Sequence, residues 1–437
     1  MAVLQRPGAA HAAPASMTGQ IIASVIGNAL EWYDFTIYGA FAVTISELFF
    51  PVKSGPGALL STLAIFGVAY VVRPLGGLVF GHYADVVGRK RALNWVIGSM
   101  SLGMALLAFA PTYAAIGIAA PVILLAARMI QGFSVGGEFA TATAFLVEHA
   151  SARNRYLHGS WQFAAQGAAT LLGGIVGSLV SRGLSADALH AWGWRLPFIL
   201  GLVIGPIGFY MRTKLKETPE FLSDKRTSGM PEKASPVMDA FAHYKARMFC
   251  AFAVVLGGTA SFYVLYVVMP SYAIRTLHLG LEASFVAPLV GGAAALIGAP
   301  VGGILADRFG PRPLLLLPVL LLLILFLPAF AWLASEPSVQ RLALVEAALS
   351  ILLGLYGGAW ATSMADLFPV GVRATGMTVS YNLGVGILGG FAPLIVTWLV
   401  AITGSPLAPA YYAMAGLAGA FAALLALPEP YAAKRVA

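Results

Sequence analysis

The chain has 437 residues, of which 10% are charged and 59% are apolar. An ordinary soluble domain has roughly 25% charged residues, so this composition excludes a soluble protein and indicates a membrane protein. The net charge of +8 does not point to nucleic acid, because basic residues also gather in the cytoplasmic loops of membrane proteins, next to anionic lipid. The single cysteine, Cys250, excludes an internal disulfide and a cysteine-based metal site.

Twelve apolar stretches follow one another along the chain, and each can cross a hydrocarbon core of about 30 Å as a helix. The first sixteen residues lack the apolar core of a signal peptide, so we expect the first stretch to be retained as a helix. The predicted spans are 20–50, 57–80, 92–110, 115–147, 157–182, 194–212, 248–274, 283–306, 313–334, 339–365, 374–402 and 407–427.

Basic residues set the expected orientation. With both termini in the cytoplasm, 19 of the 26 Lys and Arg residues fall in cytoplasmic segments, five fall outside, and Arg73 and Arg128 fall within spans. Residues 213–246 hold 11 charged side chains among 34 and predict a solvated cytoplasmic loop. This loop separates a first half, 1–212, from a second half, 247–437, with six spans each.

The two halves share a loop motif. GHYADVVGRKR follows the second span and GILADRFGPR follows the eighth, and both fit G-x-x-A-D-x-x-G with basic residues after it. An internal repeat of this kind is typical of transporters with a central binding site. We expect the glycines to allow close helix approach and each Asp to accept hydrogen bonds from a helix N-terminus. The residues concerned are Gly81, Asp85, Gly88, Arg89, Gly303, Asp307, Arg308 and Gly310.

With these motifs the chain resembles the major facilitator superfamily, and within it the metabolite:proton symporter family. The similar stretches are GNALEWYDFTIYG, RPLGGLVFGHYADVVGRKR, RMIQGFSVGGE, WGWRLPF, LKETPEF and LFPVGVRATGMTVSYNLGVGILGG. The resemblance implies an all-α membrane protein of twelve transmembrane helices in two six-helix bundles. It also implies a substrate site between the bundles, alternating access and coupling to protons. SWQFAAQ and HAWGWRLPF most resemble the citrate and tricarballylate permeases.

Two carboxylates, Glu31 and Asp34, lie in the middle of the first span. An ionised side chain at that depth costs about 2.5–3.5 kcal/mol, so it is usually paired, hydrated or functional. Arg128 lies near the middle of the fourth span, and the first and fourth helices of each half line the cavity in the resembled fold. We therefore predict an Asp34–Arg128 pair. It is either purely structural or a switch in which protonation of the carboxylate frees Arg128 for an anionic substrate.

Two further charged residues lie within spans. Arg73 precedes Pro74, and it either supports the carboxylates or binds substrate. Glu138 is either a proton carrier or a gate partner. The charged residues within spans are three acids, Glu31, Asp34 and Glu138, and two bases, Arg73 and Arg128. Their net charge is −1 when all are ionised, so an anion binds favourably only when protons enter with it. We therefore expect symport of a small di- or tricarboxylate with protons, without a cofactor.

Uncharged polar residues at similar depth are candidates for orienting such a substrate, although each could instead be a hydrogen bond between helices. They are Asn28, Gln131, Gln162, Gln166, Tyr263, Tyr266, Tyr381 and Asn382.

Other functions fit the residues less well. Residues 132–136 match the G-x-S-x-G pattern of serine hydrolases, but they lie within a helical span where a nucleophile elbow cannot form, so we expect no enzyme. A symporter for proline or betaine, or for shikimate-like acids, remains an alternative, as does a membrane sensor that transports nothing. We expect a monomer in a bacterial inner membrane.

Overall fold

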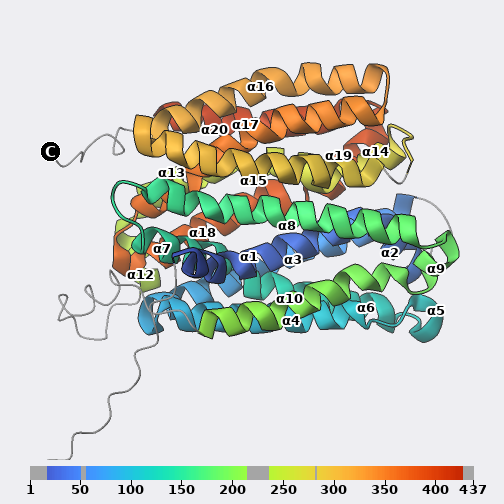
Figure 1. Cartoon of the computed structure of the whole chain (residues 1–437), viewed down its shortest axis with the longest axis horizontal. Coiled ribbons are helices and arrows are strands. Elements are labelled where there is room, and N and C mark those ends of the chain that lie inside the picture. Colours follow the sequence, from blue (N-terminus) through green and yellow to red (C-terminus); the bar gives the residue numbers. More distant parts are fainter. Residues whose placement is uncertain (1–16, 51–55, 214–235, 281–282, 427–437) are drawn as a thin grey trace, which may run out of the picture.

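The structure is a computed structural model that describes residues 17–50, 56–213, 236–280 and 283–426. Within these ranges the chain is helical almost throughout (Figure 1). Lipid offers no hydrogen bonds, so a spanning chain must bond its backbone groups internally, and helices do so. The LKETPEF stretch and both chain ends lie outside the described residues.

The first half runs from α1 to α10. It contains α1 (Met17–Ala40), α2 (Ala42–Phe49), α3 (Pro56–Val87), α4 (Arg89–Ala108), α5 (Tyr113–Ile116), α6 (Ala119–Val135), α7 (Glu138–Glu148), α8 (Arg155–Gly183), α9 (Ala186–Ala191), η1 (Gly193–Arg195) and α10 (Leu196–Thr213).

The second half runs from α12 to α20. It contains α12 (Pro236–His243), α13 (Lys245–Tyr263), the π-helix η2 (Val264–Val268), α14 (Met269–Arg275), α15 (Ala283–Phe309), α16 (Pro311–Ser335), α17 (Val339–Asp366), η3 (Val370–Val372), α18 (Arg373–Val385), the π-helix η4 (Gly386–Gly390), α19 (Ala392–Thr403) and α20 (Ala408–Ala426). The predicted loop 213–246 therefore includes a helix, α12.

Eleven described runs of helix are long and apolar enough to cross a membrane. The run α1–α2 makes twelve, and its polar residues around Glu31 and Asp34 lower its hydropathy. Four predicted spans are interrupted, and the first of them breaks at Phe41 between α1 and α2. The fourth breaks between α6 and α7, and the seventh and eleventh each contain a five-residue π-helix. Such π-turns are rare and often mark functional sites.

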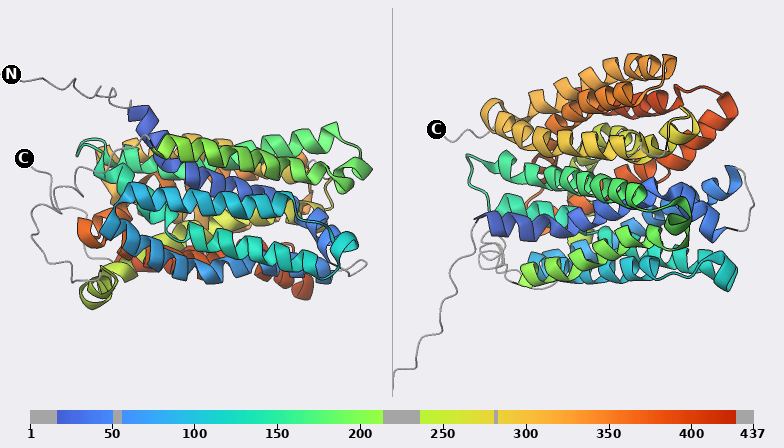
Figure 2. Two further views of the ribbon diagram at one scale, coloured as in Figure 1. Left: turned by 90° about the horizontal axis from the view of Figure 1, so that it is seen from below. Right: turned by 45° about the vertical axis from the view of Figure 1, so that its right-hand side comes forward.

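The long helices run side by side along the longest axis of the molecule (Figures 1 and 2). The halves meet where α8 packs on α15 and where α3 packs on α18. A Cβ atom on Gly167 would lie 2.6 Å from the backbone nitrogen of Leu296, and one on Gly292 would lie 2.5 Å from that of Leu171. Glycine is therefore required where α8 and α15 approach, as in other closely packed membrane helices.

Candidate transport site

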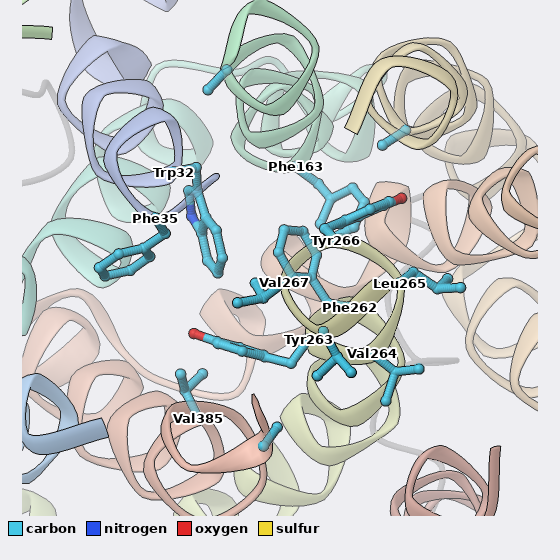
Figure 3. Close-up of a cluster of buried hydrophobic side chains, with 14 of the residues drawn as sticks. Trp32, Phe35, Phe163, Phe262, Tyr263, Val264, Leu265, Tyr266, Val267 and Val385 are labelled. Carbon is cyan, nitrogen blue, oxygen red and sulfur yellow. The ribbon is translucent and has the colours of Figure 1, made fainter. Parts of the chain in front are cut away.

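Aromatic side chains from both halves meet at the centre of the molecule. They surround a small cavity of about 10 Å³, which is roughly the space of one water molecule. Figure 3 shows Trp32 from α1 opposite Phe262 and Tyr263 from α13. A cavity of this size is too small for a metabolite, so binding of one there requires the surrounding helices to move apart. Its lining residues are Trp32, Phe163, Gln166, Gly258, Thr259, Phe262, Tyr263, Trp360, Tyr381 and Val385.

A buried ion pair lies beside this aromatic cluster. Arg73 of α3 donates through Nη2 to Oε1 of Glu31 on α1, and both side chains are buried. The guanidinium carbon lies 4.3 Å from the centre of the Tyr70 ring and 5.2 Å from that of Phe35. Nε and Nη1 of Arg73 have no hydrogen-bond partner among the described residues. Arg73 is thus held by one carboxylate oxygen and by aromatic faces, and its Nε and Nη1 donors remain unused among the described residues.

The pair expected between Asp34 and Arg128 is present in the structure. Arg128 of α6 donates through Nη1 to Asp34 Oδ2, and the same nitrogen is 3.0 Å from Gln131 Oε1. The guanidinium lies over the Tyr38 ring, 3.8 Å from its centre. Within the described part of the chain, Nε and Nη2 of Arg128 and Oδ1 of Asp34 have no hydrogen-bond partner. The first and fourth spans therefore meet through charges, as predicted, and Arg128 also keeps unused donors.

Glu138 has a partner that the sequence analysis had assigned to the cytoplasmic segment. Arg212, near the end of α10, is fully buried and pairs with Glu138 through Nη1 and Nη2. Its guanidinium also donates to the carbonyls of Ala23, Ser24 and Leu93, at 3.1, 3.1 and 2.6 Å. This ion pair ties α7 and α10 to α1 and α4 within one half.

The predicted net charge of the buried set needs correcting. The sum of −1 omitted Arg212, and with it the acids Glu31, Asp34 and Glu138 are balanced by three arginines. The first half therefore contains a neutral set of three pairs, and each added proton makes that set more positive by one charge.

Three of the eight predicted polar residues, Gln166, Tyr263 and Tyr381, line the cavity. Tyr381 stacks on Phe139 with the rings 3.9 Å apart. Tyr263 donates to the Tyr70 hydroxyl at 2.5 Å. Asn28 donates to the Gln162 carbonyl at 3.0 Å, which joins α1 to α8.

Two predicted residues point elsewhere. The Tyr266 hydroxyl is 3.3 Å from the Gly291 carbonyl on α15, and Figure 3 shows this ring directed away from Trp32. Asn382 donates to the Gly136 carbonyl at 2.7 Å and links α18 to the α6–α7 break. Neither side chain lines the central cavity.

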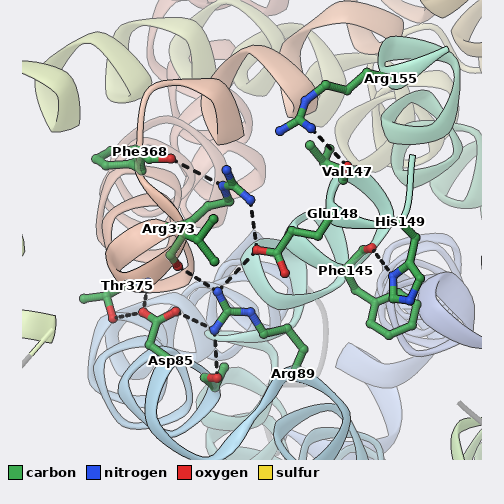
Figure 4. Close-up of polar contacts among 12 residues, drawn as sticks. Asp85, Arg89, Phe145, Val147, Glu148, His149, Arg155, Phe368, Arg373 and Thr375 are labelled. Carbon is green, nitrogen blue, oxygen red and sulfur yellow. Dashed lines mark hydrogen bonds and ion pairs between the residues drawn. The ribbon is translucent and has the colours of Figure 1, made fainter. Parts of the chain in front are cut away.

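The loop motif of the first half ends in a buried polar network at one end of the bundle, which we call the motif end (Figure 4). Asp85 accepts from the backbone nitrogen and hydroxyl of Thr375 at 3.0 and 2.6 Å, and from Arg89 Nη1 at 2.7 Å. Glu148 of α7 accepts from Arg373 at 2.9 Å and from Arg89 at 3.4 Å. Asp85 thus bonds the N-terminus of α18 across the two halves, as expected for the motif.

The second copy of the motif makes the same contact in the opposite direction. Asp307 of α15 accepts from the backbone nitrogens of Tyr156 and Leu157, both at 2.9 Å, at the start of α8. Close by, Arg155 pairs with Asp366 at 3.0 Å. The internal repeat predicted from the two motifs therefore appears as two reciprocal contacts between the halves.

The motif glycines act in two ways, and only Gly303 shows the tight helix approach that was expected. Gly88 and Gly310 have φ of 122° and 86°, which side-chain-bearing residues rarely adopt. A Cβ atom on Gly303 would lie 2.9 Å from Leu157, and one on Gly81 would lie 3.4 Å from Thr375. The basic residues of the two copies differ. Arg89, which follows Gly88, is buried, whereas Arg308, which lies inside the second copy, is exposed beside the ring of Phe309.

Comparison with known proteins identifies the class. Residues 24–379 and 290–437 match the family model described as Major Facilitator Superfamily, and the chain belongs to this family of membrane transporters. The two-bundle fold and the reciprocal loop contacts agree with this assignment.

Two groups of curated relatives are similar to the chain. A citrate-proton symporter of Salmonella typhi is 34% identical over 419 residues, covering 95% of this chain and 96% of that protein. A proline/betaine transporter of Escherichia coli strain K12 is 35% identical over 405 residues, covering 90% and 80%. These relatives are named as transporters, which agrees with our interpretation that the chain is not an enzyme.

Solved structures agree on the fold. The xylose transporter XylE from E. coli, in a partially occluded inward-open conformation, superposes with a TM-score of 0.75 at 16% identity. The match covers 94% of this chain and 98% of that one.

Proposed function

We propose that the protein imports a small di- or tricarboxylate such as citrate together with protons, by alternating access. The observation that carries this proposal is the pair of buried arginines beside the central cluster. Arg73 and Arg128 each bind a carboxylate through one nitrogen and leave two nitrogens without a partner among the described residues. Guanidinium groups grip carboxylates at two points, so these unused donors suit a substrate with more than one carboxylate.

Protonation of Asp34 is the proposed coupling step. While Asp34 is ionised, its charge holds Arg128. A proton on Asp34 removes that charge, and Arg128 is left as a buried cation without a counter-ion, which is costly. A carboxylate of the substrate can replace Asp34 and remove this cost. Substrate and proton therefore favour each other's binding.

Charge balance supports uptake of about one proton for each substrate charge. The three ion pairs Glu31–Arg73, Asp34–Arg128 and Glu138–Arg212 sum to zero, so an anion alone would leave a net negative charge in a site that excludes water. Glu31 is a second acceptor, because its partner Arg73 has the same unused donors as Arg128.

The contacts at the motif end support the transport cycle. The halves are joined there through Asp85 and Asp307. At the opposite end a pocket of about 170 Å³ lies between α3, η2–α14 and α19, lined by residues that include Leu59, Tyr272 and Val396. We propose that the contacts at the motif end must break before substrate leaves the protein at the motif end.

A zwitterion such as proline or betaine is the second candidate. Aromatic faces bind ammonium groups, and the central cavity is lined by Trp32, Tyr263 and Trp360 among others. The proline/betaine transporter is also as similar in sequence as the citrate symporter. One carboxylate on Arg128 and an ammonium group in the aromatic cluster would satisfy such a substrate.

Uptake assays in proteoliposomes distinguish a carboxylate substrate from a zwitterionic one. We expect labelled citrate to accumulate when the outside is acidic, and labelled proline and betaine to accumulate poorly. Asp34→Asn should abolish accumulation while exchange of internal for external citrate persists. If the Asp34→Asn variant still concentrates citrate as the wild type does, the assignment of coupling to Asp34 is wrong. If proline or betaine accumulates and citrate does not compete, the carboxylate assignment is wrong.

A further inference from the structure

The second half contains a buried carboxylate that none of the ion pairs uses. Glu346 on α17 is fully buried, and it forms no ion pair among the described residues. It lies seven residues after the first residue of α17, so it is about 10 Å along the helix from that end. The rule applied to Glu31 and Asp34 applies equally here, because a charge at such depth is costly and is usually paired, hydrated or functional.

The surroundings of Glu346 are polar but uncharged. The Ser350 hydroxyl, one helical turn further along α17, lies 3.4 Å from Oε2, and Oε1 has no hydrogen-bond partner in the described part of the chain. A Cβ atom on Gly291 of α15 would lie 3.1 Å from Oε2 and 2.4 Å from the Tyr266 ring. The absence of a side chain at Gly291 therefore makes room for both the carboxyl group and the tyrosine. Tyr266 is the titratable side chain that adjoins this pocket.

We infer that Glu346, with Ser350 and Tyr266, forms a second proton-binding site in the second half. A neutral carboxylic acid satisfies the pocket, since it can donate one hydrogen bond and accept another without a cation. An ionised carboxylate needs water or a positive charge, and the described residues around the pocket supply no positive charge in the conformation seen here. Glu346 should therefore carry its proton while this conformation lasts and release it when the helices around it separate.

A continuous set of contacts joins this site to the first half. Tyr266 belongs to the π-helix η2, and its ring packs on Phe262 of the central cluster with centroids 4.5 Å apart. The next residue of η2, Val267, contacts α1 near Gly39, where a Cβ atom would lie 3.5 Å from Val267. The same helix α1 carries Asp34. Separation of α1 from η2 would thus disturb Tyr266 and open the pocket of Glu346, which links the two proton sites to one movement.

Infrared spectroscopy of the purified protein in lipid tests the protonation directly and needs no substrate. Wild-type protein at neutral pH should show the C=O stretching band of a buried protonated carboxylic acid, and Glu346→Gln should lose it. The control Glu336→Gln replaces an exposed acid paired with Arg341 at the start of the same helix, and it should keep the band. A band that is unchanged in Glu346→Gln would mean that Glu346 is ionised, and the proposal would fail.

A second measurement tests whether Glu346 releases its proton during transport. This part of the inference rests on the proposed symport of citrate and protons. The ratio of protons to citrate, taken from the reversal potential in proteoliposomes, should fall by about one in Glu346→Gln while accumulation driven by Asp34 persists. A ratio equal to that of wild type and of Glu336→Gln would overturn release in the cycle. If citrate is not transported at all, the proposed substrate fails, whereas the infrared result still stands or falls on its own.

Discussion

Arg128 is held by one carboxylate oxygen, one amide oxygen and one aromatic face, and this incomplete coordination is the basis of its proposed role in binding substrate. Lysine keeps the positive charge but cannot bind a carboxylate at two points. A hydrogen bond to a charged group contributes about 1.5–3 kcal/mol. We therefore predict that Arg128→Lys weakens citrate binding by about 10- to 100-fold, as measured by competition against labelled citrate. Undiminished affinity would show that Arg128 does not contact the substrate.

Arg212 is a different kind of residue, because every contact found for it lies within the first half. Arg212→Met would leave Glu138 buried and unpaired, which costs about 3–5 kcal/mol. We predict a clear fall in the thermal stability of the purified protein. The double variant Arg212→Met/Glu138→Leu removes both charges and should recover much of the loss. If the single variant is as stable as the wild type, the pair does not hold the half together.

Some charged residues of the site could be predicted from the sequence and others could not. The Asp34–Arg128 pair was predictable because two opposite charges lay at the same depth of two spans known to face each other in the resembled fold. Arg212 was missed because it directly precedes a basic loop, and a charge count cannot tell a buried arginine from a solvated one. Glu346 could have been found by the rule applied to Glu31, since both are acids within apolar spans.

At the scale of the element, the π-helix η2 explains why Tyr266 does not line the central cavity. Tyr263 and Tyr266 are three residues apart and would share a face of a regular α-helix. The π-helix η2 begins between them, at Val264, and its wider turn rotates Tyr266 toward α15. Periodicity does not reveal a π-turn, because the residues on both sides of it are equally apolar. Hydropathy accounts for eleven of the spans, whereas the α1–α2 run has a lower hydropathy because of its polar residues around Glu31 and Asp34.

Close packing of α3 on α6 gives a prediction for whole helices. A Cβ atom on Gly76 would lie 1.8 Å from the Phe133 carbonyl oxygen, which belongs to the backbone and cannot move aside as a side chain can. Overpacking of this kind costs typically about 1–3 kcal/mol or more. Gly76→Ala should therefore lower the melting temperature and the yield of folded protein.

The matched control lies on the neighbouring helix α4. Gly98 is exposed and a Cβ atom there meets nothing within 4 Å, so Gly98→Ala should be neutral or slightly stabilising. Equal melting temperatures of the two variants in the same detergent would mean that α3 and α6 can separate without loss.

At the scale of the molecule, the two halves hold each other through the same device used twice. Asp85 reaches from the first half to the start of α18, and Asp307 reaches from the second half to the start of α8. Each acid neutralises the positive end of a helix dipole and bonds its free backbone nitrogens. Neither acid touches the central cluster, so they should govern the equilibrium between conformations and leave the binding site intact.

Substitution of Asp85 and Asp307 tests whether these acids govern the conformational equilibrium without affecting substrate binding. Asp85→Asn and Asp307→Asn each remove one charge from the motif end, and each should shift the protein toward the conformation that is open there, because an amide is a weaker partner for a helix dipole. The double variant should shift it further. Spin labels on the exposed residues Arg91 and Arg308, in a background with Cys250→Ser, would report the separation of the halves. Citrate turnover should change while affinity changes little. A large loss of affinity with an unaltered label distance would instead place these acids in the binding site.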